Sequence, residues 1–442
     1  MDKEEIFELV RRYVDEKEEK HYQPGDPIPY AGCIYDSEEL CNVIDVALEF
    51  WLAGGTYARE FERLLSEFLG VPFCSLVNSG SSANLLAVMA LTSPLLGERR
   101  VQPGDEIITV ACGFPTTVAP IIQCGAVPVF LDVSLPGYNV NTALLERARS
   151  SRTKAVIFAH TLGNPFDLKT VTGFCEKYGL WLIEDNCDAL GSEYCLDGVW
   201  RKTGSFGDIG TSSFYPAHHI AMGEGGAVYT KNPLLHKILR SLRDWGRDCV
   251  CPPGHDNACG HRFTQQYGTL PAGYDHKYVY SHLGFNLKAT DLQASVGVAQ
   301  IKKAGWFIER RRSNWAYLRE KLAPLEHWLI LPEKEADTEP SWFGFLLTVR
   351  DTCPVTRNQI TSYLEAHHIQ TRPLFAGNLL RHPCFEHLRE GTDYRIAGDL
   401  QITDHIMKQS FWIGVYPGME RTMLDEMIRR ISEVCGESKG HL

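Results

Sequence analysis

Short apolar runs alternate with helical segments between about residues 55 and 235 of the chain. The clearest runs, rich in Ile, Val, Leu and Phe, lie at 106–110, 127–131, 155–159 and 180–183. This alternation predicts an α/β fold, in which a parallel sheet is joined by helical crossovers. Ligands of such sheets bind beyond the carboxyl ends of the strands, so we expect a functional site there.

The pattern changes at both ends of this region and in one internal stretch. Residues 1–50 predict two helical stretches around a Pro/Gly break, and a long helix near residue 310 leads into a smaller C-terminal domain. From 247 to 280 the periodicity dissolves into Cys, Gly, Pro, Asp and His, as in an inserted loop. Long loops of this kind are usually functional or disordered. We predict an N-terminal helical segment (1–50) packed with the small domain, a large domain (51–310) carrying the inserted loop, and a small domain (311–442).

The composition is that of a globular protein with room for a substantial interior. The 442 residues are 44% hydrophobic and 22% charged, and this length suits one large and one smaller domain. No apolar run approaches the roughly 20 residues that a membrane span needs, and the N-terminus lacks the features of a signal peptide. We therefore predict a cytoplasmic protein with no membrane partner, whose 14 cysteines are reduced.

The charge of the chain argues against a nucleic-acid partner. The net charge is −11, whereas binding to a phosphate backbone relies on concentrated Lys and Arg. The densest basic run, at 310–312, is expected on a solvent-exposed helix face. An anionic substrate must therefore be held by a local pocket.

One strand-to-helix turn is a candidate anion site. The run at 73–77 predicts a strand, and Asn78, Ser79 and Gly80 predict a turn into a helix that begins near Ser81. A helix N-terminus presents free N–H groups and a partial positive charge, which suits a phosphate. Ordinary helix capping explains the same residues without a ligand.

Two further positions carry candidate chemistry. Asp185 follows the apolar run at 180–183, where an unpaired buried carboxylate is costly, so a partner such as an ion pair is needed. His218 and His219 stand beside the Gly-rich turn at 223–226. A histidine pair in such a place is more often structural than catalytic, so the pair alone leaves both readings open.

Three cysteines of the inserted loop are candidate metal ligands. Cys249 and Cys251 are followed after seven residues by Cys259, a spacing that allows all three thiols to converge on one metal centre. A fourth ligand must come from elsewhere. Four thiolates hold zinc as readily as a 2Fe-2S cluster, so zinc, iron-sulfur and no metal remain open on spacing alone.

Five motifs in a fixed order carry a resemblance to a known family. They occupy residues 78–84, 113–117, 183–191, 213–226 and 284–294. In this order they resemble the sugar aminotransferase family of pyridoxal fold type I, and within it the branch of iron-sulfur nucleotide-sugar 3-dehydrases. The resemblance implies an aspartate aminotransferase-like α/β fold, with a mainly parallel central sheet in the large cofactor-binding domain and a smaller α+β C-terminal domain.

The resemblance implies that the cofactor is pyridoxal or pyridoxamine phosphate (PLP or PMP). Gly80, Ser81 and Ser213 match the phosphate-cup positions of the family. Asn286 matches a phosphate contact that comes from the neighbouring subunit, which implies a homodimer.

The ring of the cofactor has its own matching positions. Phe114 would stack on the ring, and Asp185 would keep the pyridine nitrogen protonated. Asp188 stands where many sugar aminotransferases carry Gln or His, and His218 stands where they carry Lys. An imidazole cannot form a stable imine and can only move protons, so the cofactor would be the loose amine form, PMP, with His218 as the catalytic base.

Substrate and metal residues follow from the same resemblance. Tyr215 and Phe343 fall at positions that distinguish the dehydrase branch, and Arg372 could meet an anionic diphosphate or make a structural salt bridge. Cys187 matches the fourth ligand of a 2Fe-2S cluster held with the three loop thiols, and Cys195 is the alternative.

The implied activity is removal of the C3 hydroxyl from a nucleotide-activated 4-keto-6-deoxyhexose, with CDP favoured and dTDP second. Electrons would come from a separate NAD(P)H-dependent flavin/iron-sulfur reductase, on a route to 3-deoxy or 3,6-dideoxy sugars of lipopolysaccharide or antibiotics. The alternatives are a dehydratase that regenerates PMP with glutamate, an ordinary sugar aminotransferase, and a metal-stabilised binding or electron-carrier protein without catalysis.

Overall fold

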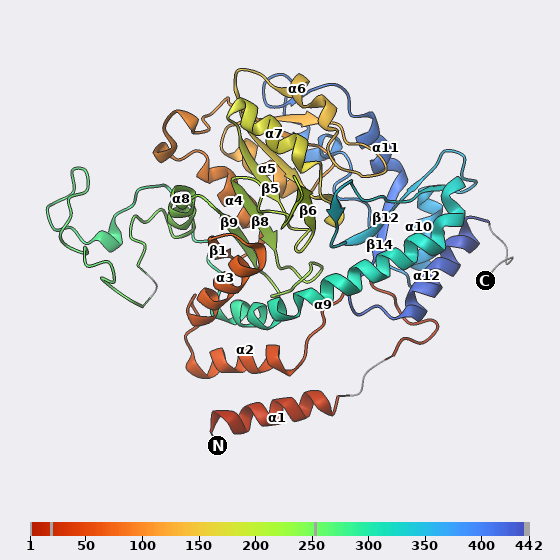
Figure 1. Cartoon of the computed structure of the whole chain (residues 1–442), viewed down its shortest axis with the longest axis horizontal. Coiled ribbons are helices and arrows are strands. Elements are labelled where there is room, and N and C mark those ends of the chain that lie inside the picture. Colours follow the sequence, from red (N-terminus) through yellow and green to blue (C-terminus); the bar gives the residue numbers. More distant parts are fainter. Residues whose placement is uncertain (1, 18–20, 252–253, 437–442) are drawn as a thin grey trace.

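An eight-stranded sheet forms the centre of the molecule in a computed structural model, which describes residues 2–17, 21–251 and 254–436 (Figure 1). Its strands, in spatial order, are β1 (Phe73–Val77), β9 (Gly226–Thr230), β8 (Ile209–Ser213), β5 (Trp181–Asp185), β4 (Thr153–Ala159), β2 (Glu106–Val110), β3 (Val127–Leu131) and β13 (Arg395–Ile396). Neighbouring strands are parallel except where β9 pairs with β1 and with β8. The predicted, mainly parallel sheet is confirmed.

Some helices cover the central sheet and connect its parallel strands, and the helices near the two ends of the chain lie beside it. They are α1 (Lys3–Asp15), α2 (Ser37–Glu49), α3 (Thr56–Leu69), α4 (Gly80–Ala90), α5 (Pro115–Gln123), α6 (Leu145–Ala148), α7 (Leu168–Tyr178), α8 (Pro233–Arg243), α9 (Asp291–Leu322), α10 (Arg357–Ala366), α11 (Gln401–Gln409) and α12 (Arg421–Val434). Because helices lie over the sheet, every residue of β3 and β5 is buried. Their sequences are therefore continuous apolar runs rather than alternating ones.

A second sheet, of three strands, lies beside the C-terminal helices. Its strands are β10 (Leu329–Ile330), β12 (Gly344–Val349) and β14 (Ser410–Gly414), in that order and antiparallel. Phe345, Phe411 and Ile431 are among the side chains that pack it against α10 and α12. A further small sheet joins β11 (Thr338–Glu339) to the hairpin of β6 (Glu193–Leu196) and β7 (Val199–Lys202).

The 32-residue helix α9 links the two halves of the molecule (Figure 1). It begins with a capping box, in which the side chains of Thr290 and Gln293 exchange hydrogen bonds with backbone N–H groups. Leu318 and Leu322, near its C-terminal end, belong to the core of the second sheet. The helix therefore runs through the boundary that we predicted between residues 310 and 311.

The N-terminal helices lie along α9 (Figure 1). The Lys303 ammonium pairs with the buried Glu39 carboxylate of α2 at 2.6 Å, and Asn42 donates to the backbone oxygen of Ser295. Ile28, in the segment before α2, is buried in the core of the second sheet. Within the described ranges, no helix combines the length and the apolar character that a membrane span requires.

Residues 247–251 and 254–280 belong to an arm that leaves the body after α8 (green, Figure 1). Its helical content in the described part is one short 3-10 turn, η4 (His276–Tyr278). A bridge between Arg247 and Tyr280 closes the arm where it meets the body.

Candidate active site

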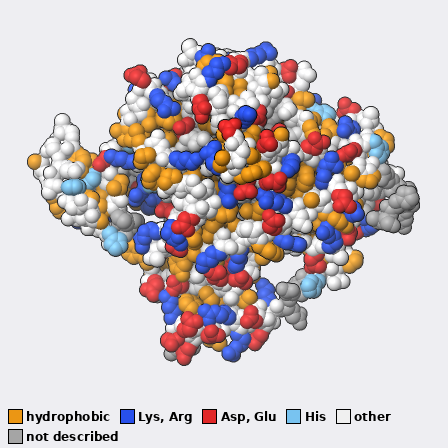
Figure 2. Space-filling view, viewed as in Figure 1, with side chains coloured by type: hydrophobic (Ala, Val, Ile, Leu, Met, Phe, Trp, Pro, Cys, Tyr) orange, Lys and Arg blue, Asp and Glu red, His pale blue; other side chains and the backbone are white. Residues whose placement is uncertain are grey.

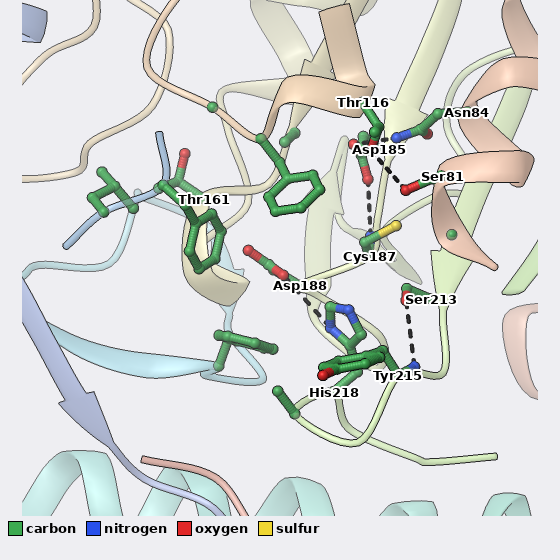
Figure 3. A pocket seen from close by; sticks show the side chains of 18 of the residues that line it. Ser81, Asn84, Thr116, Thr161, Asp185, Cys187, Asp188, Ser213, Tyr215 and His218 are labelled. Carbon is green, nitrogen blue, oxygen red and sulfur yellow. Dashed lines mark hydrogen bonds and ion pairs between the residues drawn. The ribbon is translucent and has the colours of Figure 1, made fainter. Parts of the chain in front are cut away.

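A cavity of about 430 Å³ opens at the carboxyl ends of the parallel strands (Figure 3). Asp185 ends β5 and Ser213 ends β8, while Gly80 follows β1. The cavity is lined by these predicted site residues: Gly80, Ser81, Phe114, Asp185, Cys187, Asp188, Ser213, Tyr215, His218, Phe343 and Arg372. Asn286, Cys249, Cys251 and Cys259 were also predicted as site residues, and they lie outside its lining.

Asp185 is held by neutral donors on three sides. Its Oδ2 atom accepts hydrogen bonds from Asn84 Nδ2 (2.8 Å) and Thr117 Oγ1 (2.6 Å), and its Oδ1 accepts from the Cys187 backbone N–H (3.2 Å). Thr211 fixes the Asn84 amide in turn, by donating to its oxygen at 2.7 Å. In the described part of the chain no cation forms an ion pair with Asp185, so the carboxylate is oriented for a cationic group that the chain does not supply.

The first turn of α4 forms an anion cradle beside Asp185. Ser79 caps the helix by accepting a hydrogen bond from Ser82 N–H (3.1 Å), and the Ser81 hydroxyl, which donates to Thr116, lines the cavity. A Cβ on Gly80 would lie 2.4 Å from Ser213 Cβ and 3.0 Å from Cys187 Sγ. Glycine therefore keeps the helix terminus open to a phosphate.

Phe114 stands at the other side of the cavity. It precedes α5 and packs edge-on against Phe375, with ring centroids 5.7 Å apart. Its side chain is nonetheless 47% exposed. An exposed aromatic face that lines a cavity is suited to stack on a flat ring. Together with Asp185 and the cradle at Gly80, it gives a site whose residues fit a pyridine ring carrying a phosphate.

His218 faces the cavity from the loop after β8 (Figure 3). Its Nδ1 atom lies 3.6 Å from Asp188 Oδ1 and has no hydrogen-bond partner among the described residues. The Phe343 ring packs against the imidazole at a centroid distance of 5.1 Å. His219 points elsewhere, since it is buried with its Nε2 2.7 Å from the Ser341 backbone oxygen. The first histidine is therefore placed for chemistry and the second is structural.

Burial keeps both His218 and Asp188 neutral. Burial, helped by the positive charge of Arg311, lowers the pKa of His218 to about 3. Burial and then the negative charge of Asp185 raise the pKa of Asp188 to about 8. At neutral pH the site thus pairs a neutral imidazole with a protonated carboxyl group, and the imidazole is free to accept a proton.

Arg311 anchors the loop that carries His218. This role was not predicted from the sequence. Arg311 is 1% exposed, so our expectation that the basic run at 310–312 lies on a solvent-exposed helix face is wrong for this residue. Its guanidinium donates to the backbone oxygens of His218 (3.2 Å), Phe343 (3.2 Å) and Trp342 (3.1 Å). Helical spacing could have identified it, because Arg311 shares the buried face of α9 with Phe307.

The mouth of the cavity carries few positive charges. Arg372 stacks on the Tyr30 ring, 4.1 Å from its centroid, and donates to the Thr371 backbone oxygen at 2.7 Å. Tyr215 lies at the same opening and is 48% exposed. Glu224, which we did not predict, also lines the cavity.

The predicted cysteine cluster does not assemble within one chain. Cys187 sits in the cavity wall, where burial and then the charge of Asp185 raise the pKa of its thiol well above the usual range. Cys249, Cys251 and Cys259 lie on the arm, which projects from the body (Figure 1). No three His, Cys, Asp or Glu side chains of the described residues lie close enough together to hold a metal. Within one chain the four thiols do not form such a group, so their convergence on one metal centre stays a prediction.

Asn286 lies at the foot of the arm, where it bridges to Asp244. It does not reach the cavity of its own chain. Cys195, the alternative ligand, lies in the β6–β7 hairpin, also outside the cavity lining.

Comparison with known proteins identifies the family. The chain matches the DegT/DnrJ/EryC1/StrS aminotransferase family over residues 34–432. The chain belongs to this family. The resemblance that we drew from five sequence motifs is confirmed, and so is the pyridoxal-enzyme fold that it implied.

Several DegT/DnrJ/EryC1/StrS relatives cover nearly all of the chain. The lipopolysaccharide biosynthesis protein RfbH of Salmonella typhimurium is 51% identical, over 98% of this chain and 98% of the relative. The dTDP-4-dehydro-2,6-dideoxy-D-glucose 3-dehydratase of Saccharopolyspora spinosa is 48% identical, over 99% of this chain and 93% of the relative. A crystal structure of GDP-4-keto-6-deoxymannose-3-dehydratase with a trapped PLP-glutamate geminal diamine superposes with a TM-score of 0.79, at 26% identity, and covers 92% of this chain and 100% of that one.

Proposed function

We propose that this protein is a PMP-dependent dehydrase that removes the C3 hydroxyl of a nucleotide-activated 4-keto-6-deoxyhexose. The observation that carries the proposal is His218, a neutral base that faces the cavity where an aminotransferase would need a lysine. Relatives named as sugar 3-dehydratases, at 48% and 26% identity, support this reading.

The cavity residues would hold PMP in a defined orientation. The turn at Gly80, with the hydroxyls of Ser81 and Ser213, would bind the phosphate, and Asp185 would meet the ring nitrogen. Phe114 would cover the ring face. PMP bound there supplies an amine for the C4 ketone of the sugar and a ring that withdraws electrons.

His218 would then move one proton. The neutral imidazole accepts it from the methylene carbon beside the ring, and the resulting imidazolium donates it to the departing C3 hydroxyl, which leaves as water. The carboxyl group of Asp188, whose Oδ1 lies 3.6 Å from Nδ1, would orient the imidazole. The wall formed by Phe343 limits the access of water to the base.

We further propose that the nucleotide is CDP, with dTDP as the second choice, and that Arg372 meets the diphosphate. A panel of CDP-, dTDP- and GDP-4-keto-6-deoxy sugars, offered to PMP-loaded protein, tests both the reaction and the nucleotide. Loss of one water from the sugar, detected by mass spectrometry, is the expected result with a CDP sugar. Formation of a 4-amino sugar that keeps its C3 hydroxyl would contradict the proposal.

We also propose that Cys187, Cys249, Cys251 and Cys259 hold a 2Fe-2S cluster in a homodimer, with electrons from an NAD(P)H-dependent flavin/iron-sulfur reductase. Conversion of the dehydrated sugar to a 3-deoxy sugar needs two electrons, and four thiols are a suitable ligand set. Iron analysis of Cys251→Ser and Cys195→Ser tests the assignment. Iron should be lost from the first variant and kept in the second; the opposite pattern would move the fourth ligand to Cys195.

A second candidate is a dehydratase that regenerates PMP with glutamate and needs no reductase. Two observations favour it: the four thiols do not meet within one chain, and the solved 3-dehydratase named above holds PLP with glutamate. Multiple turnovers of the nucleotide sugar, with glutamate as the only other added reactant, would support this candidate. Turnovers that require a reductase and ignore glutamate would exclude it.

A further inference from the structure

We infer that the arm of one chain docks over the cavity of a second copy and brings Cys249, Cys251 and Cys259 to Cys187 of the partner subunit. The inference deepens the proposed function, because it locates the metal site of that proposal between two subunits. It starts from the separation of the four predicted ligands within one chain. Three of the four thiols lie on the projecting arm, and the fourth lies in the cavity wall at the end of β5 (Figures 1 and 3).

The arm is internally braced, so its projection is part of the fold. Asp248 accepts hydrogen bonds from Ser281 Oγ (2.5 Å) and contacts His276 Nε2 at 2.7 Å. Arg262 pairs with Asp275 through two hydrogen bonds, of 3.0 and 2.8 Å. These contacts tie the two sides of the arm to each other rather than to the chain's own cavity.

The arm and its foot expose an apolar surface with nothing from the same chain to cover it. Figure 2 shows the arm standing clear of the body, with a few scattered hydrophobic side chains on the face in view. Leu283 is 96% exposed, and Phe263 and Tyr280 are more than half exposed. Trp245, Val250, Tyr274 and Tyr278 complete the surface. Several exposed large apolar side chains on one projecting segment suit a protein interface.

Charge identifies the second copy as the occupant. The cavity is lined by Asp185, Glu224 and the protonated Asp188, and by one arginine, Arg372, although it has to accept anionic phosphates. Cations lie where the arm meets the body: Arg247 stacks on the Trp245 ring at 4.5 Å from its centroid, and Lys288 stacks on the same ring at 3.5 Å while it pairs with Asp244. An arm docked at a partner's cavity would supply the positive charge that this cavity lacks.

In a two-fold symmetric dimer, this docking would occur twice. Each chain carries one arm and one cavity, so a two-fold axis that places one arm over the partner's cavity also places the partner's arm over the first cavity. Both metal sites are then completed by the same contact.

Mixed dimers test this directly. One chain carries Cys187→Ser, the other carries Cys251→Ser, and two different affinity tags isolate the mixed species. If the thiols meet between subunits, one site of the mixed dimer keeps all its ligands. It should hold about half of the wild-type iron, whereas either variant alone holds little.

The mirror-image control places both substitutions in one chain and pairs it with a wild-type chain. Sites shared between subunits should then both fail. Sites built within one subunit would give the opposite results, with half the iron in this control and none in the first mixed dimer. That opposite pattern would overturn the inference while leaving the proposed cluster intact.

Disulfide mapping, which does not depend on iron, separates the proposed docking of the arm from the proposed cluster. Apo protein is assembled from nitrogen-15-labelled and unlabelled chains and oxidised with diamide, and the disulfide-linked peptides are read by mass spectrometry. Docking predicts that Cys187 becomes linked to an arm cysteine of the differently labelled chain. Such links would support the inference even if the wild-type protein held no iron, in which case only the cluster proposal would fail. Links confined to chains of one label, or no link to Cys187, would overturn it.

Discussion

In the proposed function, His218 determines what chemistry the cavity can perform. A lysine at this position would hold the cofactor covalently, whereas a neutral imidazole leaves it free and takes up a proton instead. Burial lowers the pKa of His218, so the imidazole is neutral at physiological pH, and the nearby Asp188 is protonated there.

Replacing His218 with Lys should change the colour of the protein and remove its activity. The lysine amine should retain pyridoxal phosphate covalently and give a yellow protein, while dehydration should fall by roughly a hundred-fold or more, as expected for loss of a general base. Visible spectra after addition of pyridoxal phosphate, with His218→Asn as the colourless control, check this result. A colourless Lys variant with full dehydration would show that the base lies elsewhere.

Asp188→Asn should stabilise the cofactor-free protein, and the gain should grow with pH. The pKa of Asp188 is raised to about 8 in the folded state, so the folded protein keeps a proton that the unfolded chain has already lost. The contribution of Asp188 to the free energy of unfolding is therefore highest at low pH, and it is lost as pH rises between about 4 and 8. An uncharged Asn avoids this loss. Melting temperatures at pH 5 and pH 8 measure the effect, and an equal shift at both values would contradict it.

At the scale of elements, local patterns predicted much of the fold and part of the site. Continuous apolar runs identified β2, β3, β4 and β5, because these strands are covered on both sides. The turn into α4 at Gly80 was readable from its capping residues. The antiparallel direction of β9 was not readable, since the short run at 226–230 carries no signal of direction.

Contacts that depend on tertiary packing could not be predicted from the sequence. Arg311 looked like one member of an exposed basic run, but the rotation of α9 turns it inward to the carbonyl groups of the His218 loop. The path of the arm at 247–280 was equally hidden, because spacing between cysteines says nothing about where a loop projects. The position of Cys187 relative to the loop thiols could not be predicted for that reason.

Arg311→Met should reduce catalysis because the His218 loop loses its anchor, and not because a contact between Arg311 and the substrate is lost. The guanidinium holds the His218 loop and the Phe343 segment together, so its loss should reduce kcat more than it raises KM. It should also lower the free energy of unfolding by about 1–3 kcal/mol, because buried carbonyls lose their donor.

Arg312→Met is the matched control, because its side chain donates to the Pro340 and Glu339 carbonyls outside the cavity. It should keep near-normal kcat. Arg311→Lys should recover part of the loss, since it restores a donor. Equal effects of Arg311→Met and Arg312→Met on kcat would show that Arg311 is only structural.

At the scale of the whole molecule, one chain contains an incomplete site. The cavity has the ring partner, the phosphate cradle and the base, but few positive charges and one of the four predicted cluster thiols. The missing groups are found on the arm and its foot, which face away from the chain's own cavity. The dimer is thus expected to be the functional unit, and dissociation should abolish activity before it unfolds the subunits.

The central claim is that His218 directs this site to eliminate a hydroxyl group rather than to transfer an amine. A single turnover of PMP-loaded protein with a CDP-4-keto-6-deoxyhexose that carries oxygen-18 at C3 tests it most directly. Wild-type protein should release the label as water, and His218→Asn should retain it on the sugar. Label that stays at C3 of a 4-amino sugar made by the wild-type protein would contradict the claim.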